Sequence, residues 1–127
     1  MRKLLPILLL CLLLTACTRE APAPRSGVYR MSAPPETLNA PSLALDAETG
    51  FFAFAYDTLS SYLPYGSYTY DASAIICATD DGLYTYLFRR VNGTTLAFIA
   101  DGSADVSLTD EDSGAPVVEG SVFLLDD

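Results

Sequence analysis

Large apolar residues recur at every second position in short stretches of this chain, and this spacing constrains the fold more than any other feature. Single alanines separate Phe52, Phe54 and Tyr56. A spacing of two places side chains on one face of a β-strand, whereas one face of a helix needs a spacing of three to four. The alternation continues after Ser26, where helical periodicity is hard to find. We expect eight strands, at residues 28–31, 43–46, 51–56, 67–70, 74–79, 83–90, 94–100 and 122–125.

Short turn sequences connect several of these strands. Asp46–Gly50, Asp80–Gly82 and Asn92-Gly93 are rich in the Asp, Asn and Gly residues that tight turns favour. Sequential strands joined in this way form an antiparallel meander, which avoids exposed edges by curling into a small barrel or half-barrel. Residues 57–66 break the alternation and are predicted to be the main irregular connection, with room for one helical turn. The sequence therefore predicts an all-β domain.

The hairpin at Asn92-Gly93 allows two registers. A two-residue loop would scatter the large apolar residues over both faces of the sheet. A three-residue loop with Gly93 in the left-handed region pairs Phe88 with Leu96 and Tyr86 with Phe98, and we predict this second register. It places Tyr84, Tyr86, Phe88, Leu96 and Phe98 inside, with Leu83, Thr85, Leu87 and Arg89 outside. Other residues predicted to point inward are Phe52, Phe54, Tyr56, Ile75, Cys77 and Thr79, and we expect this aromatic interior to be filled.

The first residues have the layout of a secretory signal, in which a positive start precedes an apolar run. The run is too short to span a membrane, which needs about 20 apolar residues. It ends in Leu14-Thr15-Ala16-Cys17, which resembles the lipobox of bacterial lipoproteins. The resemblance implies cleavage before Cys17 and acylation of that cysteine, with no cofactor other than this covalent lipid. We expect a signal peptide at 1–16, a Pro-rich, stiff lipidated tether at 17–26 and a β-barrel-like domain at 27–127.

Charge and missing residue types exclude several functions. Cleavage would remove Arg2 and Lys3 and leave five of the seven Lys and Arg residues against 16 Asp and Glu, a net charge near −11. Nucleic acid needs a basic footprint, so we do not expect it as a partner. The chain has no His, and its one Lys lies in the signal, so the usual general base and amine nucleophile are missing. We expect no enzyme. Cys77 would have no partner for a disulfide, and we predict that it is a small buried apolar residue.

A longer set of motifs extends from Gly27 to Leu125. It comprises Leu43-x-Leu45, Phe52-x-Phe54-x-Tyr56, Leu59-Ser60-Ser61-Tyr62-x-Pro64-x-Gly66-x-Tyr68, Thr79-Asp80-Asp81-Gly82-x-Tyr84-x-Tyr86-x-Phe88, Leu96-x-Phe98 and Glu119-Gly120-Ser121-Val122-Phe123. This succession resembles small extracytoplasmic lipocalin-like β modules of Gram-positive bacteria, which occur as lone lipoproteins or appended to membrane metalloproteases resembling beta-lactam sensors. The resemblance implies a lipocalin-like barrel and supplies no catalytic set. Where those modules often carry Lys, this chain has Leu83, Thr85 and Leu87, so its outer face is less basic.

Candidate binding residues lie in the irregular connection. Tyr62, Tyr65 and Leu59 are predicted to occupy a loop, where large apolar side chains more often serve recognition than core packing. Two hypotheses follow. In the first, the domain is a monomeric, non-catalytic interaction or sensing module, held by lipid at the extracytoplasmic face of the cell membrane, that binds another extracytoplasmic protein or envelope component. In the second, it is a lipocalin-like carrier of a small apolar ligand, which would need a cavity of about 300 Å³ or more.

Two acidic segments contain residue types that could carry chemistry. Residues 101–112 place oxygen ligands at several positions of a calcium-loop template, among them Asp101, Ser103, Asp105 and Asp112, but the sixth position is Val106 where the template needs Gly. The segment is therefore a weak calcium candidate, and a solvated acidic loop is the simpler interpretation. Asp80 and Asp81 are adjacent in a tight turn and are expected to point apart, which disfavours paired-carboxylate catalysis.

Overall fold

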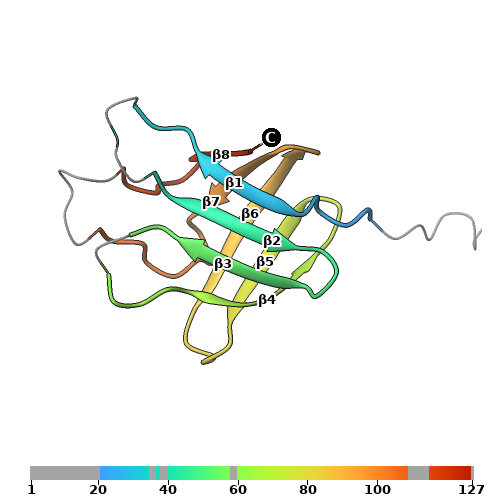
Figure 1. Cartoon of the computed structure of the whole chain (residues 1–127), viewed down its shortest axis with the longest axis horizontal. Coiled ribbons are helices and arrows are strands. Elements are labelled where there is room, and N and C mark those ends of the chain that lie inside the picture. The colour runs from blue at the N-terminus through green and yellow to red at the C-terminus, as the bar shows by residue number, and fades with distance from the viewer. Residues whose placement is uncertain (1–20, 35–36, 38–39, 58–59, 109–114, 127) are drawn as a thin grey trace, which may run out of the picture.

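Eight antiparallel strands close into a barrel in the computed structural model (Figure 1), which describes residues 21–34, 37, 40–57, 60–108 and 115–126. Each strand pairs with the next along the chain, and β8 pairs with β1 to close the ring. The strands are β1 (Gly27–Met31), β2 (Ser42–Asp46), β3 (Phe51–Ala55), β4 (Tyr65–Tyr70), β5 (Ala74–Thr79), β6 (Thr85–Asn92), β7 (Thr95–Ile99) and β8 (Val122–Leu125). The predicted all-β meander is confirmed, and the lipocalin-like barrel is closed, so its sheet has no open edge.

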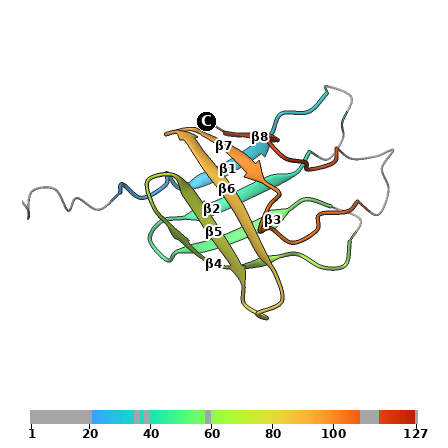
Figure 2. The ribbon, with the colours of Figure 1, turned by 180° about the vertical axis from the view of Figure 1, so that it is seen from behind.

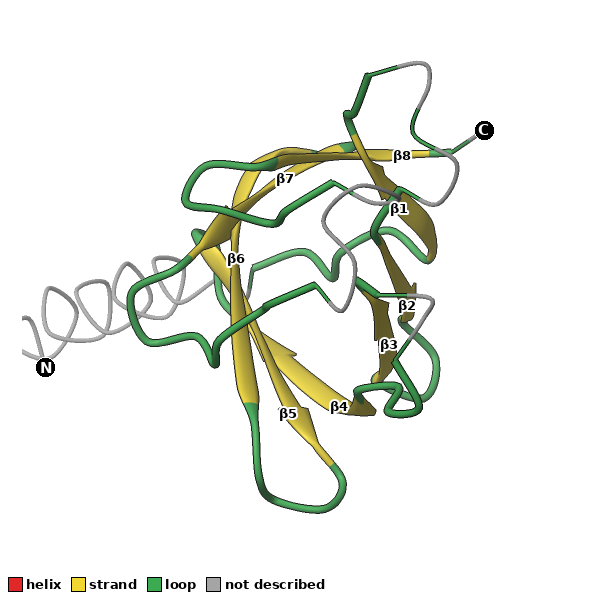
Figure 3. Ribbon diagram, turned by 90° about the vertical axis from the view of Figure 1, so that its left-hand side faces the viewer, coloured by secondary structure: helices red, strands yellow, loops and turns green. Residues whose placement is uncertain are grey.

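The barrel has two ends that differ in the length of their connections. The end where the chain enters β1 carries the short turns β2–β3, β4–β5 and β6–β7, on the right in Figure 1 and on the left in Figure 2. We call it the tether end. The opposite end carries the connections β1–β2, β3–β4, β5–β6 and β7–β8, and in Figure 3 it faces the viewer, with the strands following one another around a ring. We call it the distal end.

The segment that leads into β1 lies against the tether end. The Tyr29 hydroxyl donates a hydrogen bond to the backbone oxygen of Arg25 (2.6 Å), and the hydroxyl of Ser26 accepts one from the backbone N–H of Ala47 (2.8 Å). Pro24 is buried. The described part of the predicted tether is therefore packed on the barrel, which fixes where the chain leaves it.

Aromatic rings fill the barrel interior. Phe54 is fully buried and lies at the centre of this cluster. The centroid of its ring lies between 5.1 and 6.4 Å from those of five others: Tyr56, Tyr86, Phe88, Phe98 and Phe123. Several of these pairs meet edge to face, the arrangement that aromatic quadrupoles favour. The predicted inward set is confirmed for the buried residues Phe52, Phe54, Ile75, Cys77, Thr79, Tyr86, Phe88, Leu96 and Phe98.

The predicted pairing of β6 with β7 is wrong. Phe88 lies opposite Phe98 and not opposite Leu96, because the hairpin closes on the pair of Asn92 with Thr95, with Gly93-Thr94 as its loop, and a bulge between Arg90 and Asn92 adds one residue to β6. Gly93 is not among the glycines with a positive φ; the side-chain oxygen of Asn92 instead accepts the backbone N–H of Thr94 (2.9 Å) and holds the turn. The true register differs from the predicted one by two residues, which preserves the facing of every side chain. This is why the inward residues were nevertheless predicted correctly.

Three local predictions also need correction. Tyr84 is exposed, not buried, because it lies beyond the last β5–β6 pair, Ala78 with Thr85, where the barrel wall ends. Tyr56 is only partly buried at the end of β3. Tyr65 belongs to β4 and not to the β3–β4 connection. Residues 58 and 59 of this connection lie outside the described residues, so its helical turn stays a prediction.

Candidate functional site

A groove of about 400 Å³ opens at the distal end, between the β3–β4 connection and the β5–β6 turn. Two segments that are well separated in the sequence form its walls. Its lining residues are Ser61, Tyr62, Leu63, Tyr65, Asp80 and Asp81. We call it the Tyr–Asp groove. Two of the three predicted binding residues, Tyr62 and Tyr65, therefore lie together in it, while Leu59 lies outside the described residues.

Asp81 fixes the β5–β6 wall of the groove. Its carboxylate accepts hydrogen bonds from the Thr79 hydroxyl (2.6 Å) and from the backbone N–H of Leu83 (3.0 Å), which hold the turn. Gly82 in this turn has a φ of 75°, a left-handed conformation that glycine adopts without strain. The bonds to Asp81 lower the pKa of its carboxyl group, that from Thr79 most and that from Tyr62 next. The carboxylate is therefore kept ionised and preorganised.

Tyr62 joins the two walls. Its hydroxyl donates to the second carboxylate oxygen of Asp81 (2.6 Å), and this bond raises the pKa of the Tyr62 hydroxyl. Its ring meets that of Tyr84 edge to face at a centroid distance of 5.5 Å. On its own loop, the backbone N–H of Tyr62 is held by the Ser60 hydroxyl (3.1 Å). The position of Tyr62 is thus set by contacts on three sides.

Tyr65 forms the outer rim of the groove. It is the first residue of β4, pairs with Ala53, and places its ring 6.1 Å from the ring of Phe51 on the outer face. About half of its side chain is exposed, as is that of Leu63. Its backbone oxygen accepts the N–H of Asp80 (3.0 Å), which sets the spacing of the two walls. The rim is therefore apolar, exposed and held by backbone contacts.

Asp80 supplies the free charge of the site. Its side chain is exposed, and within the described ranges no side chain or backbone group pairs with its carboxylate. Asp81 by contrast uses both oxygens internally. The two carboxylates are adjacent but have different tasks, one structural and one available to a ligand.

The sequence reasoning missed Leu63, Asp80 and Asp81 as parts of this site. A signal existed, because the β4–β5 hairpin pairs Ser67 with Ala78 and an antiparallel register then brings Tyr65 beside Asp80. The predicted start of β4 at Ser67 was two residues late, which hid this relation.

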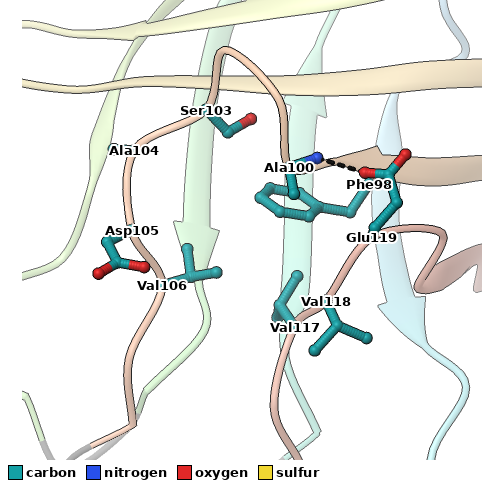
Figure 4. Close-up of a pocket in the computed structure, with 9 residues that line it drawn as sticks. All are labelled: Phe98, Ala100, Ser103, Ala104, Asp105, Val106, Val117, Val118 and Glu119. Carbon is teal, nitrogen blue, oxygen red and sulfur yellow. Dashed lines mark hydrogen bonds between the residues drawn. The ribbon is translucent and has the colours of Figure 1, made fainter.

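A second hollow lies at the same end of the barrel (Figure 4). It has a volume of about 450 Å³ and lies between residues 100–106 and 117–119, with Phe98, Val106 and Val117 among its lining residues. The backbone N–H of Ala100 donates to the Glu119 carboxylate across it (2.6 Å). Its walls come from two segments of the β7–β8 connection that carry no recognisable motif, so it could not be predicted from the sequence.

The residues named as weak calcium candidates have different surroundings. Asp101 and Asp105 are exposed. The Ser103 hydroxyl donates to the Ile99 carbonyl (2.5 Å) and accepts from the Leu87 N–H (2.8 Å), so it already has two partners. Asp112 lies outside the described residues, and the described part of the chain contains no group of three or more His, Cys, Asp or Glu residues arranged to hold a metal. A solvated acidic loop stays the favoured prediction for this segment, with calcium binding as the weak alternative.

Cys77 is fully buried, as predicted. Burial raises the pKa of its thiol far above the ordinary value, which suppresses the reactive thiolate. The residue therefore packs as an apolar side chain.

The barrel and the Tyr–Asp groove define an all-β domain with an exposed aromatic and acidic site. Comparison with protein-family models, curated proteins and solved structures gave no match to this chain. Within the described residues, no helix has the length and apolar character needed to cross a bilayer. We therefore infer function from the residues themselves.

Proposed function

We propose that this chain is an extracytoplasmic lipoprotein, held at the membrane by lipid on Cys17, whose barrel is a non-catalytic interaction or sensing module. The observation that carries the proposal is the position of the Tyr–Asp groove, at the opposite end of the barrel from the tether. Five residue steps separate Cys17 from Pro22, which limits this part of the chain to about 18 Å. A lipidated Cys17 would thus keep the tether end near the membrane and present the groove away from it.

The filled interior supports this proposal over catalysis or transport inside the barrel. Rings in mutual contact occupy the centre, and the exposed groove has no His or Lys, since the chain has none after its third residue. A site with a free carboxylate, exposed rings and no activated nucleophile is suited to binding, not to bond cleavage.

Cys17→Ala is expected to abolish anchoring. Without the thiol that carries the lipid, the protein should be released or remain unprocessed at the mass of the precursor. Membrane fractionation and intact-mass measurement check this result. Cys11→Ala is the matched control, because Cys11 lies in the apolar run of the signal, and this variant should fractionate like the wild type. Mature-size Cys17→Ala protein in the membrane fraction would contradict the anchor.

A lipocalin-like carrier is the second candidate, favoured by the hollow in Figure 4, whose volume of about 450 Å³ is large enough for a small apolar ligand. Native mass spectrometry of the protein released from detergent separates the two functions. We expect the mass of the unliganded lipoprotein. A bound small molecule that is lost from a Val106→Trp variant, in which the larger side chain fills the hollow, would instead establish the carrier.

A further inference from the structure

We propose that the Tyr–Asp groove binds a basic side chain, arginine or lysine, from an extended segment of a partner protein. This inference rests on the proposed interaction function and names the chemistry of the partner. The groove combines the two groups that such a side chain needs, an available carboxylate at Asp80 and the aromatic rings of the exposed Tyr65 and the partly buried Tyr62. A cation over an aromatic face gains electrostatic attraction to the ring, and a carboxylate strengthens its hydrogen bonds.

The chain already uses this chemistry at its other end. The Arg90 guanidinium lies 5.7 Å from the centre of the Tyr70 ring and donates a hydrogen bond to the backbone oxygen of Asp71 (2.8 Å). There a tyrosine face and an oxygen acceptor together hold an arginine of the same molecule. The Tyr–Asp groove offers the same pair of groups, with a full negative charge as the acceptor and without an arginine of its own.

The charges of the described residues leave this groove uncompensated. Arg30 is paired with Asp126 at 3.0 Å on the β1–β8 side of the barrel. The other arginines in the described ranges are Arg25 in the tether and Arg89 and Arg90 on β6. None of them lines the groove. A net charge near −11 after signal cleavage would also attract a basic partner over distance, as far as salt screening permits.

The apolar rim favours a polypeptide segment over a free cation. Leu63, Tyr65 and Phe51 are exposed beside one another along the outside of the barrel, and Phe51 and Tyr65 contact through their rings. Ala53 pairs with Tyr65 and Ala44 with Ala53, so small side chains extend this surface across β3 and β2. A basic residue flanked by apolar residues would match both the groove and the rim.

Peptide binding to the full-length lipoprotein in detergent tests the proposal. The probe is a fluorescent five-residue peptide with arginine between leucine and phenylalanine, and its matched peptide carries glutamine in place of arginine. We expect the arginine peptide to bind about tenfold more tightly, from one exposed ion pair and one cation–π contact together. Raising the salt concentration should weaken this preference. Fluorescence anisotropy measures both affinities.

Variants assign the effect to residues. Asp80→Asn should reduce the preference for the arginine peptide over the glutamine peptide about fivefold. It should leave the stability of the protein unchanged, because the Asp80 carboxylate has no partner within the described residues. Tyr65→Leu should weaken the arginine peptide more than the glutamine peptide, since it removes the ring and keeps an apolar rim. Glu48→Gln is the control: it removes the same charge from an exposed residue in the β2–β3 turn at the tether end, and it should bind like the wild type.

Each other outcome overturns the inference in a different way. Equal binding of the two peptides, or equal effects of Asp80→Asn and Glu48→Gln, would reject a basic side chain as the ligand. The groove would then be an apolar docking site. No binding of either peptide would reject the groove itself. A concentration-dependent dimer that Asp80→Asn abolishes would assign the groove to a second copy of this chain. The proposed lipid anchoring is tested separately, by membrane fractionation of the Cys17→Ala variant.

Discussion

Phe54→Ala is expected to lower the free energy of unfolding by about 3–5 kcal/mol. Phe54 is fully buried, and its ring contacts five others in the centre of the barrel. Removing it loses the transfer free energy of the ring and leaves a cavity that strands paired all around the barrel cannot collapse to fill. A domain of this size has a total stability of about 5–15 kcal/mol. The variant should therefore lie near the limit of folding.

Urea unfolding measures the effect, with an expected decrease of roughly 2 M in the transition midpoint at ordinary slopes. Phe51→Ala is the matched control, because it removes the same side chain from the same strand but on the exposed outer face. Its loss should be at most about 1 kcal/mol, the value of one cross-strand pair. Equal losses for the two variants would mean that the aromatic cluster does not carry the stability of the barrel.

The same cluster bears on function. Phe88 on β6 and Phe123 on β8 meet edge to face at 5.4 Å, and Phe54 on β3 bridges them to Tyr86. Rings that already contact one another from several strands occupy the space in which a lipocalin-like carrier would hold its ligand. We therefore expect a ligand or partner to bind at the surface of the distal end. The filled interior therefore favours an interaction module over a carrier with its ligand inside the barrel.

The strands could be predicted from the sequence because their signal is local. Alternation at Phe52 and Phe54, or at Tyr86 and Phe88, needs only neighbouring residues to be read, and the burial of one face follows. The same locality explains the errors. The turn at Gly93-Thr94 and the bulge between Arg90 and Asn92 together shift the pairing by two residues, which changes the partners but not the faces, so the pattern of apolar residues does not reveal it.

The candidate site could be predicted only in part. Tyr62 and Tyr65 could be predicted as binding residues because they lie in a segment that breaks the alternation, but their relation to Asp80 and Asp81 depends on two segments brought together by the β4–β5 pairing. The adjacency of Asp80 and Asp81 in the sequence disfavours paired-carboxylate catalysis, but the structural role of Asp81 depends on hydrogen bonds that only three-dimensional contacts reveal. The spacing of residues along the chain says little about these contacts.

Gly66→Ala is expected to damage both the barrel and the groove. Gly66 is buried on β4, and a methyl group there would meet the backbone oxygen of Ala78, the backbone nitrogen of Asp80 at 2.8 Å and the backbone carbonyl carbon of Thr79 at 3.0 Å. All three are main-chain atoms of β5 and its turn, which cannot rotate away as a side chain could. We expect a loss of about 3 kcal/mol, at the upper end of what overpacking costs. Urea unfolding measures this loss.

Gly93→Ala provides the control, because no atom lies within 4 Å of its added methyl group and its φ is not positive. That variant should unfold with the midpoint of the wild type. Where Gly66→Ala still folds, the strain should fall on the bond from the Asp80 N–H to the Tyr65 oxygen, since Tyr65 and Asp80 flank the crowded contact. The two walls of the groove would then separate, and the preference for the arginine peptide should decrease even in the folded fraction. An unchanged preference in folded Gly66→Ala protein would show that the spacing of Tyr65 and Asp80 does not determine recognition. A loss of both stability and peptide preference would show that one close backbone contact supports both the barrel wall and its binding site.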